Sequence, residues 1–143
     1  MSINEYTHIG GEIMDLIEIF KAFGDETRIR IFNLLRDGEL CVCEIETILG
    51  ITQSNASRHL NKLRAAGIIT YEKKSQWVYY RMNEEFLEHC DLLYQFINRE
   101  VQKNPVYQDD MAKLSKFKES NLSCKEIEED REKVLQCIKC RNK

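Results

Sequence analysis

Two cysteines separated by one residue, Cys41 and Cys43, are the residues best suited to chemistry in this sequence. Thiolates are the preferred ligands of soft metal and metalloid ions. Consecutive helical residues turn by about 100°, so two thiols in an i, i+2 relation share one ion only if the first helical turn is distorted. A helix start also favours the thiolate through the helix dipole. The alternative is two small core residues in a tight turn.

A second pair, Cys137 and Cys140, lies near the end of the chain. At i, i+3 on a helix these residues share a face and are candidate ligands of one ion. The alternative is that Cys137 packs with Val134 and Ile138 while Cys140 frays. A thioredoxin-like interpretation needs a preceding strand in a βαβ unit, which the sequence does not predict.

A run of hydrogen-bonding side chains is the third chemical feature. Its members are Gln53, Ser54, Asn55, Ser57, Arg58 and His59. Gln and Asn suit adenine edges, Arg suits guanine, and Ser suits phosphate. Residues 51–82 hold six basic side chains against Glu72 alone, a net charge of +5, although the whole chain is −3. We expect this segment, with Lys73 and Lys74, to contact DNA. The alternatives are a plain solvated helix face and, for His59, a half-buried histidine.

Helical periodicity and turn residues predict the elements that position these groups. Helices are expected at residues 12–23, 26–36, 41–49 and 53–66, and a long helix at 83–103. Residues 68–72 and 76–82, rich in Ile, Val, Tyr and Trp, indicate a two-stranded hairpin. A short helix, a Gly-containing turn, a capped helix and a hairpin together predict a winged helix-turn-helix, mainly α with a small β-hairpin.

Composition limits the other classes. The chain has 143 residues, 43% hydrophobic and 31% charged, as in one globular unit. No apolar run approaches the roughly 18–20 residues of a membrane span, and the N-terminus lacks an export signal, so we expect a cytoplasmic protein. No Ser/His/Asp set, phosphate loop or carboxylate pair stands out, so we expect no enzyme.

Asn104-Pro105 marks the clearest boundary. Residues 1–104 are predicted to form a DNA-binding and dimerisation domain, and residues 105–143 a helical, cysteine-containing extension. In that extension an amphipathic segment carries Met111, Leu114 and Phe117, and Ser123-Cys124-Lys125-Glu126 fits a capping box that begins a last helix.

Three motifs together carry a resemblance. They are Glu39-Leu40-Cys41-Val42-Cys43-Glu44, then Thr52-Gln53-Ser54-x-x-Ser57-Arg58-His59-Leu60-x-x-Leu63-x-x-Ala66-Gly67-Ile68, and Trp77-Val78-Tyr79-Tyr80-Arg81. In this order and spacing they resemble the ArsR/SmtB family of small metal-responsive repressors, over residues 12–103. The wing departs from the family, because Ser75-Gln76 stands where a Gly-Arg turn is common.

The resemblance implies a winged-helix homodimer that represses its own operon and leaves operator DNA when a metal or metalloid binds. It implies Cys41 and Cys43 as ligands. It also implies a dimer interface from the first and last domain helices, which agrees with the apolar stripes Ile13–Phe23 and Phe86–Ile97. The family's zinc site would need histidines, but Glu84, Phe86, Ile97 and Glu100 stand at the matching positions.

As(III) or Sb(III), which want three thiolates, are the expected inducers, with Cd(II) or Pb(II) as the alternative. Arsenic-responsive relatives have a third cysteine three residues after the second, where this chain has Glu46. The third thiolate must then come from Cys90, Cys124, Cys137 or Cys140. Cys90 lies on an apolar stripe, which favours a buried packing role.

Two other functions are also compatible with this sequence. One is a thiol redox or persulfide sensor of the same fold, which oxidant alone would release from DNA. The other is a metallochaperone or small redox enzyme that does not bind DNA. The helix-turn-helix and its basic segment oppose the second, and a mobility-shift assay discriminates between them.

Overall fold

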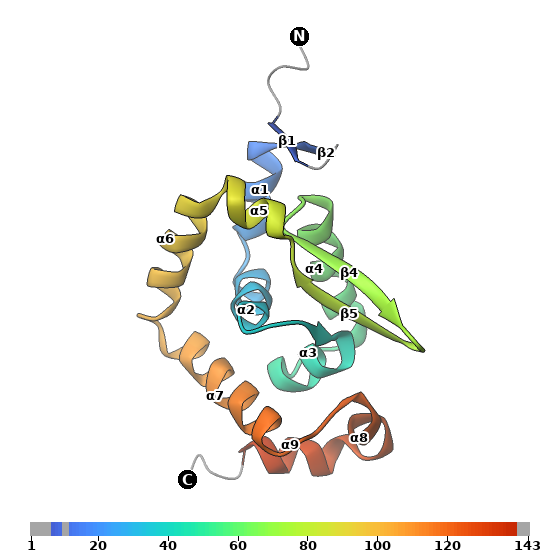
Figure 1. The fold of residues 1–143 in the computed structure, drawn as a ribbon. Helices are drawn as coiled ribbons and strands as arrows, with labels where there is room; N and C mark the ends of the chain where they lie inside the picture. The colour runs from blue at the N-terminus through green and yellow to red at the C-terminus, as the bar shows by residue number, and fades with distance from the viewer. Residues whose placement is uncertain (1–6, 10–11, 140–143) are drawn as a thin grey trace.

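The computed structural model describes residues 7–9 and 12–139, which form short strands and nine helices within those ranges (Figure 1). The strands are β1 (Thr7–Ile9), β2 (Glu12–Met14), β3 (Leu40–Cys41), β4 (Ile69–Lys74) and β5 (Trp77–Met82). The helices are α1 (Leu16–Phe23), α2 (Glu26–Leu35), α3 (Val42–Leu49), α4 (Gln53–Ala65), α5 (Glu84–His89), α6 (Asp91–Val101), α7 (Pro105–Glu119), α8 (Cys124–Glu129) and α9 (Arg131–Lys139).

The first two helices begin at aspartate caps. The carboxylate of Asp15 accepts from the Ile17 amide and that of Asp25 from the Arg28 amide. The expected first helix over 12–23 is therefore too long, because residues 12–14 form β2, which pairs with β1. The cap at Asp15 fixes the true start.

The helix-turn-helix forms as predicted from α3 and α4. Gly50, which ends α3, has φ +70°, a left-handed conformation that favours glycine. Thr52 Oγ1 then accepts from the Asn55 amide and begins α4. Ala56, Leu60 and Leu63 of α4 are buried in the core, as their spacing predicts.

The wing is a three-stranded antiparallel sheet in the order β3-β5-β4. The hairpin of β4 and β5 was expected and extends away from the helices (Figure 1). Strand β3 was not expected: Leu40 pairs with Tyr80, and Cys41 pairs with Tyr79. Two residues carry too little periodicity to predict a strand, so only the tertiary pairing reveals it.

The long helix expected over 83–103 is divided at Cys90 into α5 and α6. Cys90 has φ −118° and ψ 35°, which takes its backbone out of the helical region. No Pro or Gly marks this break in the sequence.

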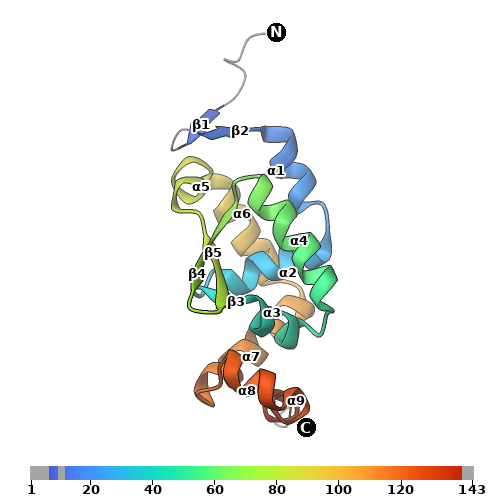
Figure 2. The same ribbon diagram turned by 90° about the vertical axis from the view of Figure 1, so that its right-hand side faces the viewer.

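The C-terminal helices pack on the winged-helix core (Figure 2). Arg30 of α2 makes a two-pronged ion pair with Asp110 of α7, with N–O distances of 2.8 and 2.9 Å. Helices α7, α8 and α9 all contact α3. The predicted capping box is present at Ser123 and Glu126, but the helix it begins ends at Glu129 and α9 follows. The division into domains at residue 104 stays a prediction.

One hydrophobic cluster runs through both parts of the chain, from Phe32 and Phe86 to Phe117 and Ile138. Phe86 and Ile97, predicted for a dimer interface, are instead buried within the chain at 0% and 7% exposed. The exposed apolar side chains of α1 and α6 are Leu16, Ile17, Phe20, Leu92 and Phe96. Within the described ranges, no helix is both long and apolar enough to cross a bilayer.

Candidate metal centre and nucleic-acid interface

Cys41 and Cys43 lie close together without any distortion of α3. Cys41 has the extended backbone of β3, with φ −74° and ψ 152°, and α3 begins only at Val42. The two Sγ atoms are consequently 3.4 Å apart. The expectations that Cys41 begins the helix and that sharing an ion must distort it are wrong, because the 100° helical rotation does not apply to a residue outside the helix.

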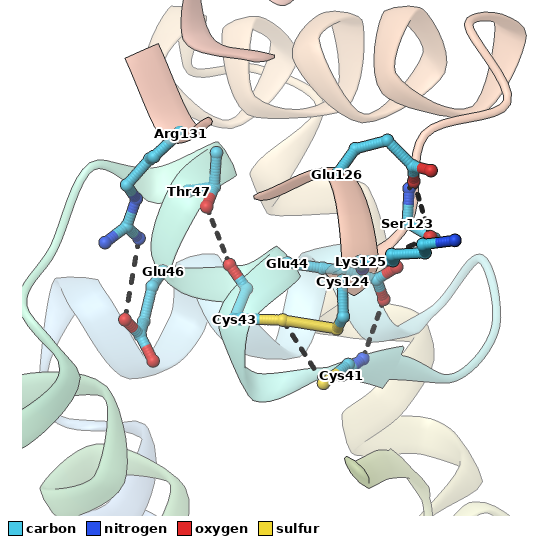
Figure 3. Close-up of a disulfide and its surroundings, with 10 residues drawn as sticks. All are labelled: Cys41, Cys43, Glu44, Glu46, Thr47, Ser123, Cys124, Lys125, Glu126 and Arg131. Carbon is cyan, nitrogen blue, oxygen red and sulfur yellow. Dashed lines mark hydrogen bonds and ion pairs between the residues drawn. A yellow bond between two sulfur atoms is a disulfide. The ribbon is translucent and has the colours of Figure 1, made fainter. Parts of the chain in front are cut away.

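Cys124 completes the cluster from the other end of the chain. It is the first residue of α8, is 2% exposed, and is joined to Cys43 as a disulfide with a Cα–Cα distance of 6.1 Å (Figure 3). The Sγ atoms of Cys41, Cys43 and Cys124 all lie within 4.8 Å of one another. Reduced, these three sulfurs could hold one soft ion.

The surroundings of the cluster are buried and contain a carboxylate. Glu44 is 8% exposed, and its Oε1 accepts from the Cys41 amide at 2.8 Å. Burial raises the pKa of the Cys41 thiol, and Glu44 raises it further. Backbone amides of Cys43 and Val42 at the start of α3 do lower this pKa, but burial outweighs them, so the expectation that the helix start favours the Cys41 thiolate is wrong. Burial also raises the pKa of Glu44, against the opposing charge of Lys118.

The other cysteines are placed elsewhere. Cys137 Sγ lies 3.5 Å from Ser120 Oγ, and the three-sulfur cluster does not include it. Cys90 lies between α5 and α6, partly buried against the core. Cys140 falls outside the described residues. Of the four cysteines left open for the third thiolate, the structure places Cys124 in the cluster. No spacing signal identifies Cys124, since 81 residues separate it from Cys43.

Glu46, at the position of the missing third cysteine, contacts the C-terminal segment. Its carboxylate lies 3.5 Å from Arg131 of α9. Burial raises the pKa of Glu46, and the Arg131 charge opposes that shift. At the α3 position that would carry a third thiol, Glu46 therefore forms an ion pair with α9. The third sulfur of the cluster comes instead from Cys124 of α8.

The polar run of α4 is largely exposed. Gln53, Ser54, Asn55 and Arg58 are solvent-exposed and Ser57 is half-buried. His59 differs, because its ring is 5% exposed and its Nδ1 lies 3.1 Å from Arg28 Nη1. Because His59 is buried, the structure does not support a contact between this ring and a base edge. The alternative interpretation, a histidine that packs against the protein, describes His59 better.

The two wing lysines also differ. Lys73 is exposed on β4. Lys74 makes an ion pair with Glu39 at 2.5 Å, and its ammonium lies 5.3 Å from the centre of the Tyr79 ring. Ser75, in the turn, has φ +59°. A phosphate that binds Lys74 must compete with Glu39.

Comparison with known proteins decides what this fold belongs to. Residues 25–71 match the family described as "Bacterial regulatory protein, arsR family". The arsenic resistance transcriptional regulator ArsR1 of Pseudomonas putida is 42% identical over 88 residues, which cover 59% of this chain and 69% of that protein. The chain belongs to the arsR family. A cadmium resistance regulatory protein CadC homolog of Staphylococcus aureus is 40% identical over 76 residues, 52% of this chain and 63% of that relative.

Solved structures agree with this arsR-family assignment. A homodimeric winged helix-turn-helix DNA-binding domain of Mycobacterium bovis superposes with a TM-score of 0.53 at 28% identity, covering 59% of this chain and 79% of that one. The predicted winged helix-turn-helix is confirmed. So is the expectation of a DNA-binding transcriptional regulator rather than an enzyme. The chain spans about two thirds of the length of the two relatives named above.

Proposed function

We propose that this arsR-family protein is a metalloid-responsive repressor. It binds operator DNA as a homodimer and leaves it when As(III) or Sb(III) binds Cys41, Cys43 and Cys124. The observation that carries the proposal is the convergence of three sulfurs within 4.8 Å from two distant segments. The arsenic and cadmium resistance regulators among its relatives support the same class of inducer.

Charge favours a trivalent ion in this cluster. Arsenious acid would exchange its three hydroxyl groups for the sulfurs of three thiols, whose protons leave with the hydroxyls as three waters, and the product is a neutral centre. A divalent ion bound to the same thiolates would leave one negative charge buried beside Glu44, which is 8% exposed. Uncompensated buried charge is costly. We therefore rank As(III) and Sb(III) above Cd(II) and Pb(II).

The position of the cluster supports coupling to DNA. Cys41 pairs through β3 with Tyr79 of the wing strand β5, and Cys43 belongs to α3, which contacts the DNA-reading helix α4. An inducer shifts the DNA equilibrium only by its differential affinity for the two states. A ligand that ties α3 and β3 to α8 acts on both elements that touch DNA.

The test measures how arsenite releases the reduced full-length protein from its own upstream DNA. A mobility-shift assay monitors the release. Cys124→Ser should bind DNA as the wild type does and require at least about tenfold more arsenite for release. Cys41→Ser and Cys43→Ser should do the same. Cys137→Ser is the matched control and should respond normally. A normal response of Cys124→Ser contradicts the three-thiolate site.

The disulfide between Cys43 and Cys124 favours a second candidate, a redox-sensing repressor of the same fold. Two thiols and one peroxide give the disulfide and two waters. Peroxide without metal should then release DNA from the wild type but not from Cys124→Ser. Arsenite should fail to release DNA if oxidation is the only signal. Titrations with Cd(II) and Pb(II) in the same assay rank the divalent ions.

A further inference from the structure

The guanidinium of Arg28, in α2, contacts two other helices, α1 and α4. Its Nε donates to the Ala22 carbonyl at 2.6 Å, and its Nη2 donates to the Lys21 carbonyl at 3.2 Å. Both carbonyls belong to the last turn of α1, and that of Lys21 also accepts from the Gly24 amide at 3.2 Å. The third nitrogen, Nη1, lies 3.1 Å from Nδ1 of His59 in α4.

Charged groups surround the His59 ring. Nδ1 lies 3.1 Å from Arg28 Nη1 and 3.8 Å from Asp25 Oδ1, and Nε2 lies 3.5 Å from Arg58 Nη2. A guanidinium has donors only, so the contact with Arg28 is a hydrogen bond when the ring is neutral and Nδ1 carries no proton. Burial lowers the pKa of His59, and the charges of Arg28 and Arg58 lower it further, against Asp25. The ring is 5% exposed and therefore cannot serve as a solvent-facing DNA contact in this conformation.

The two helices that Arg28 contacts are α4, the proposed recognition helix, and α1, which has an exposed apolar face. Leu16, Ile17 and Phe20 of α1 are 62%, 56% and 53% exposed. In the proposed homodimer this face would lie at the interface. The angle between α1 and α4 then determines how far apart the two recognition helices lie.

We infer that Arg28 and His59 are positioning residues that hold α4 at a fixed angle to α1 and so set the operator half-site spacing that the dimer accepts. The inference rests on the proposed homodimer but not on the inducer site. Half-sites of a dimeric helix-turn-helix protein lie about one helical turn, 10–10.5 base pairs, apart. One inserted base pair therefore rotates one half-site by about 35° relative to the other.

The experiment uses a duplex selected by the full-length wild type from a random library, with zero, one or two base pairs inserted between its half-sites. The wild type should lose at least about tenfold in affinity with each insertion. In Arg28→Lys, one ammonium cannot span the three acceptors, and in His59→Leu the acceptor is gone. Both should bind the unaltered duplex within a few-fold of the wild type but lose less than about threefold per insertion.

Two further variants separate positioning from general stability. His59→Asn keeps an acceptor near the Nδ1 position and should restore the spacing preference. Arg36→Lys is the matched control, because the Arg36 guanidinium donates to Asn33 Oδ1 three residues earlier, and this variant should behave as the wild type. Circular dichroism checks folding, and sedimentation checks the oligomeric state.

The outcomes are distinct. If Arg28→Lys and His59→Leu remain folded dimers and weaken every duplex by the same factor, the two residues are only structural and the inference is overturned. A wild type that tolerates the insertions as a dimer overturns it as well. A monomeric wild type removes the homodimer of the proposed function and this inference with it, whereas a failed arsenite response alone leaves the inference standing.

Discussion

Individual side chains in this protein owe their chemistry to burial more than to sequence neighbours. Cys41 ends strand β3 and precedes helix α3, yet burial rather than the helix dipole sets the direction of its pKa shift. His59 lies among exposed polar residues of α4, yet it is buried against Arg28. The residue types were visible in the sequence, but the environment that decides their roles was not.

Protonation of His59 should destabilise the fold. Burial and the charges of Arg28 and Arg58 hold its folded pKa below the ordinary 6.5, although Asp25 opposes this. The unfolded chain therefore binds the proton first. The stability that His59 contributes is complete above pH 6.5 and is lost as the pH falls toward the folded pKa. Urea unfolding at pH 7.5 and 5.5 should show a larger loss for the wild type than for His59→Asn. Equal losses would show that this ring does not titrate in that window.

Arg58 should distinguish base reading from phosphate binding. It is exposed in α4, and its Nη2 bonds Asn55 Oδ1 at 3.2 Å. If it reads a guanine edge, Arg58→Ala should cost about 1–3 kcal/mol of operator affinity and relax one base position. Lys73→Ala should instead weaken all DNA alike and reduce the salt dependence. Competition binding over a set of singly altered operators measures both. An unchanged affinity of Arg58→Ala would remove this residue from the reading set.

Secondary-structure elements far apart in the sequence converge on α3. Helices α7, α8 and α9 all contact it, and β3, just before it, pairs with the wing. Any ligand that ties the start of α3 to α8 therefore acts at a junction between the wing, the helix-turn-helix and the C-terminal segment. This arrangement places the proposed inducer site next to the elements that we propose contact DNA.

The ion pair between Arg30 and Asp110 should be a main attachment of α7 to α2. Asp110 is 0% exposed, and both of its oxygens bond the guanidinium. Asp110→Ala leaves Arg30 without its buried partner, so we expect a loss of about 3–5 kcal/mol in the free energy of unfolding. Asp109→Ala is the control, because its side chain is 51% exposed, and it should change stability by less than about 1 kcal/mol. Urea denaturation compares them, and similar values for the two would disprove the claim.

At the scale of the whole molecule, one hydrophobic core serves the winged helix and the C-terminal segment together. What this core leaves outside is an apolar face on α1 and α6. Phe20 is 53% exposed, Leu92 82% and Phe96 55%. In the proposed homodimer, such a face would be buried in a symmetric interface.

Disruption of that face should produce monomers. Phe20→Glu or Phe96→Glu places charge on a surface that we expect to be desolvated between two protomers. Sedimentation at micromolar concentration should show the wild type as a dimer and either variant as a folded monomer with weak operator binding. Tyr71→Glu is the control for the oligomeric state, because Tyr71 is 48% exposed and lies on strand β4 of the wing. A dimeric double variant would place the interface elsewhere.

The sequence alone determined the local features. These are the helix-turn-helix, the wing hairpin, the capping box at Ser123, and the candidate ligand pair Cys41 and Cys43 next to the start of a helix. These depend on periodicity, caps and turns, which act over a few residues. Tertiary structure alone decided the rest. Cys124 lies in the cluster although 81 residues separate it from Cys43. Cys41 is the last residue of a strand, and Phe86 and Ile97 are buried in the core. These positions depend on which segments distant in the sequence pack together, and the local spacing of residues does not predict that packing.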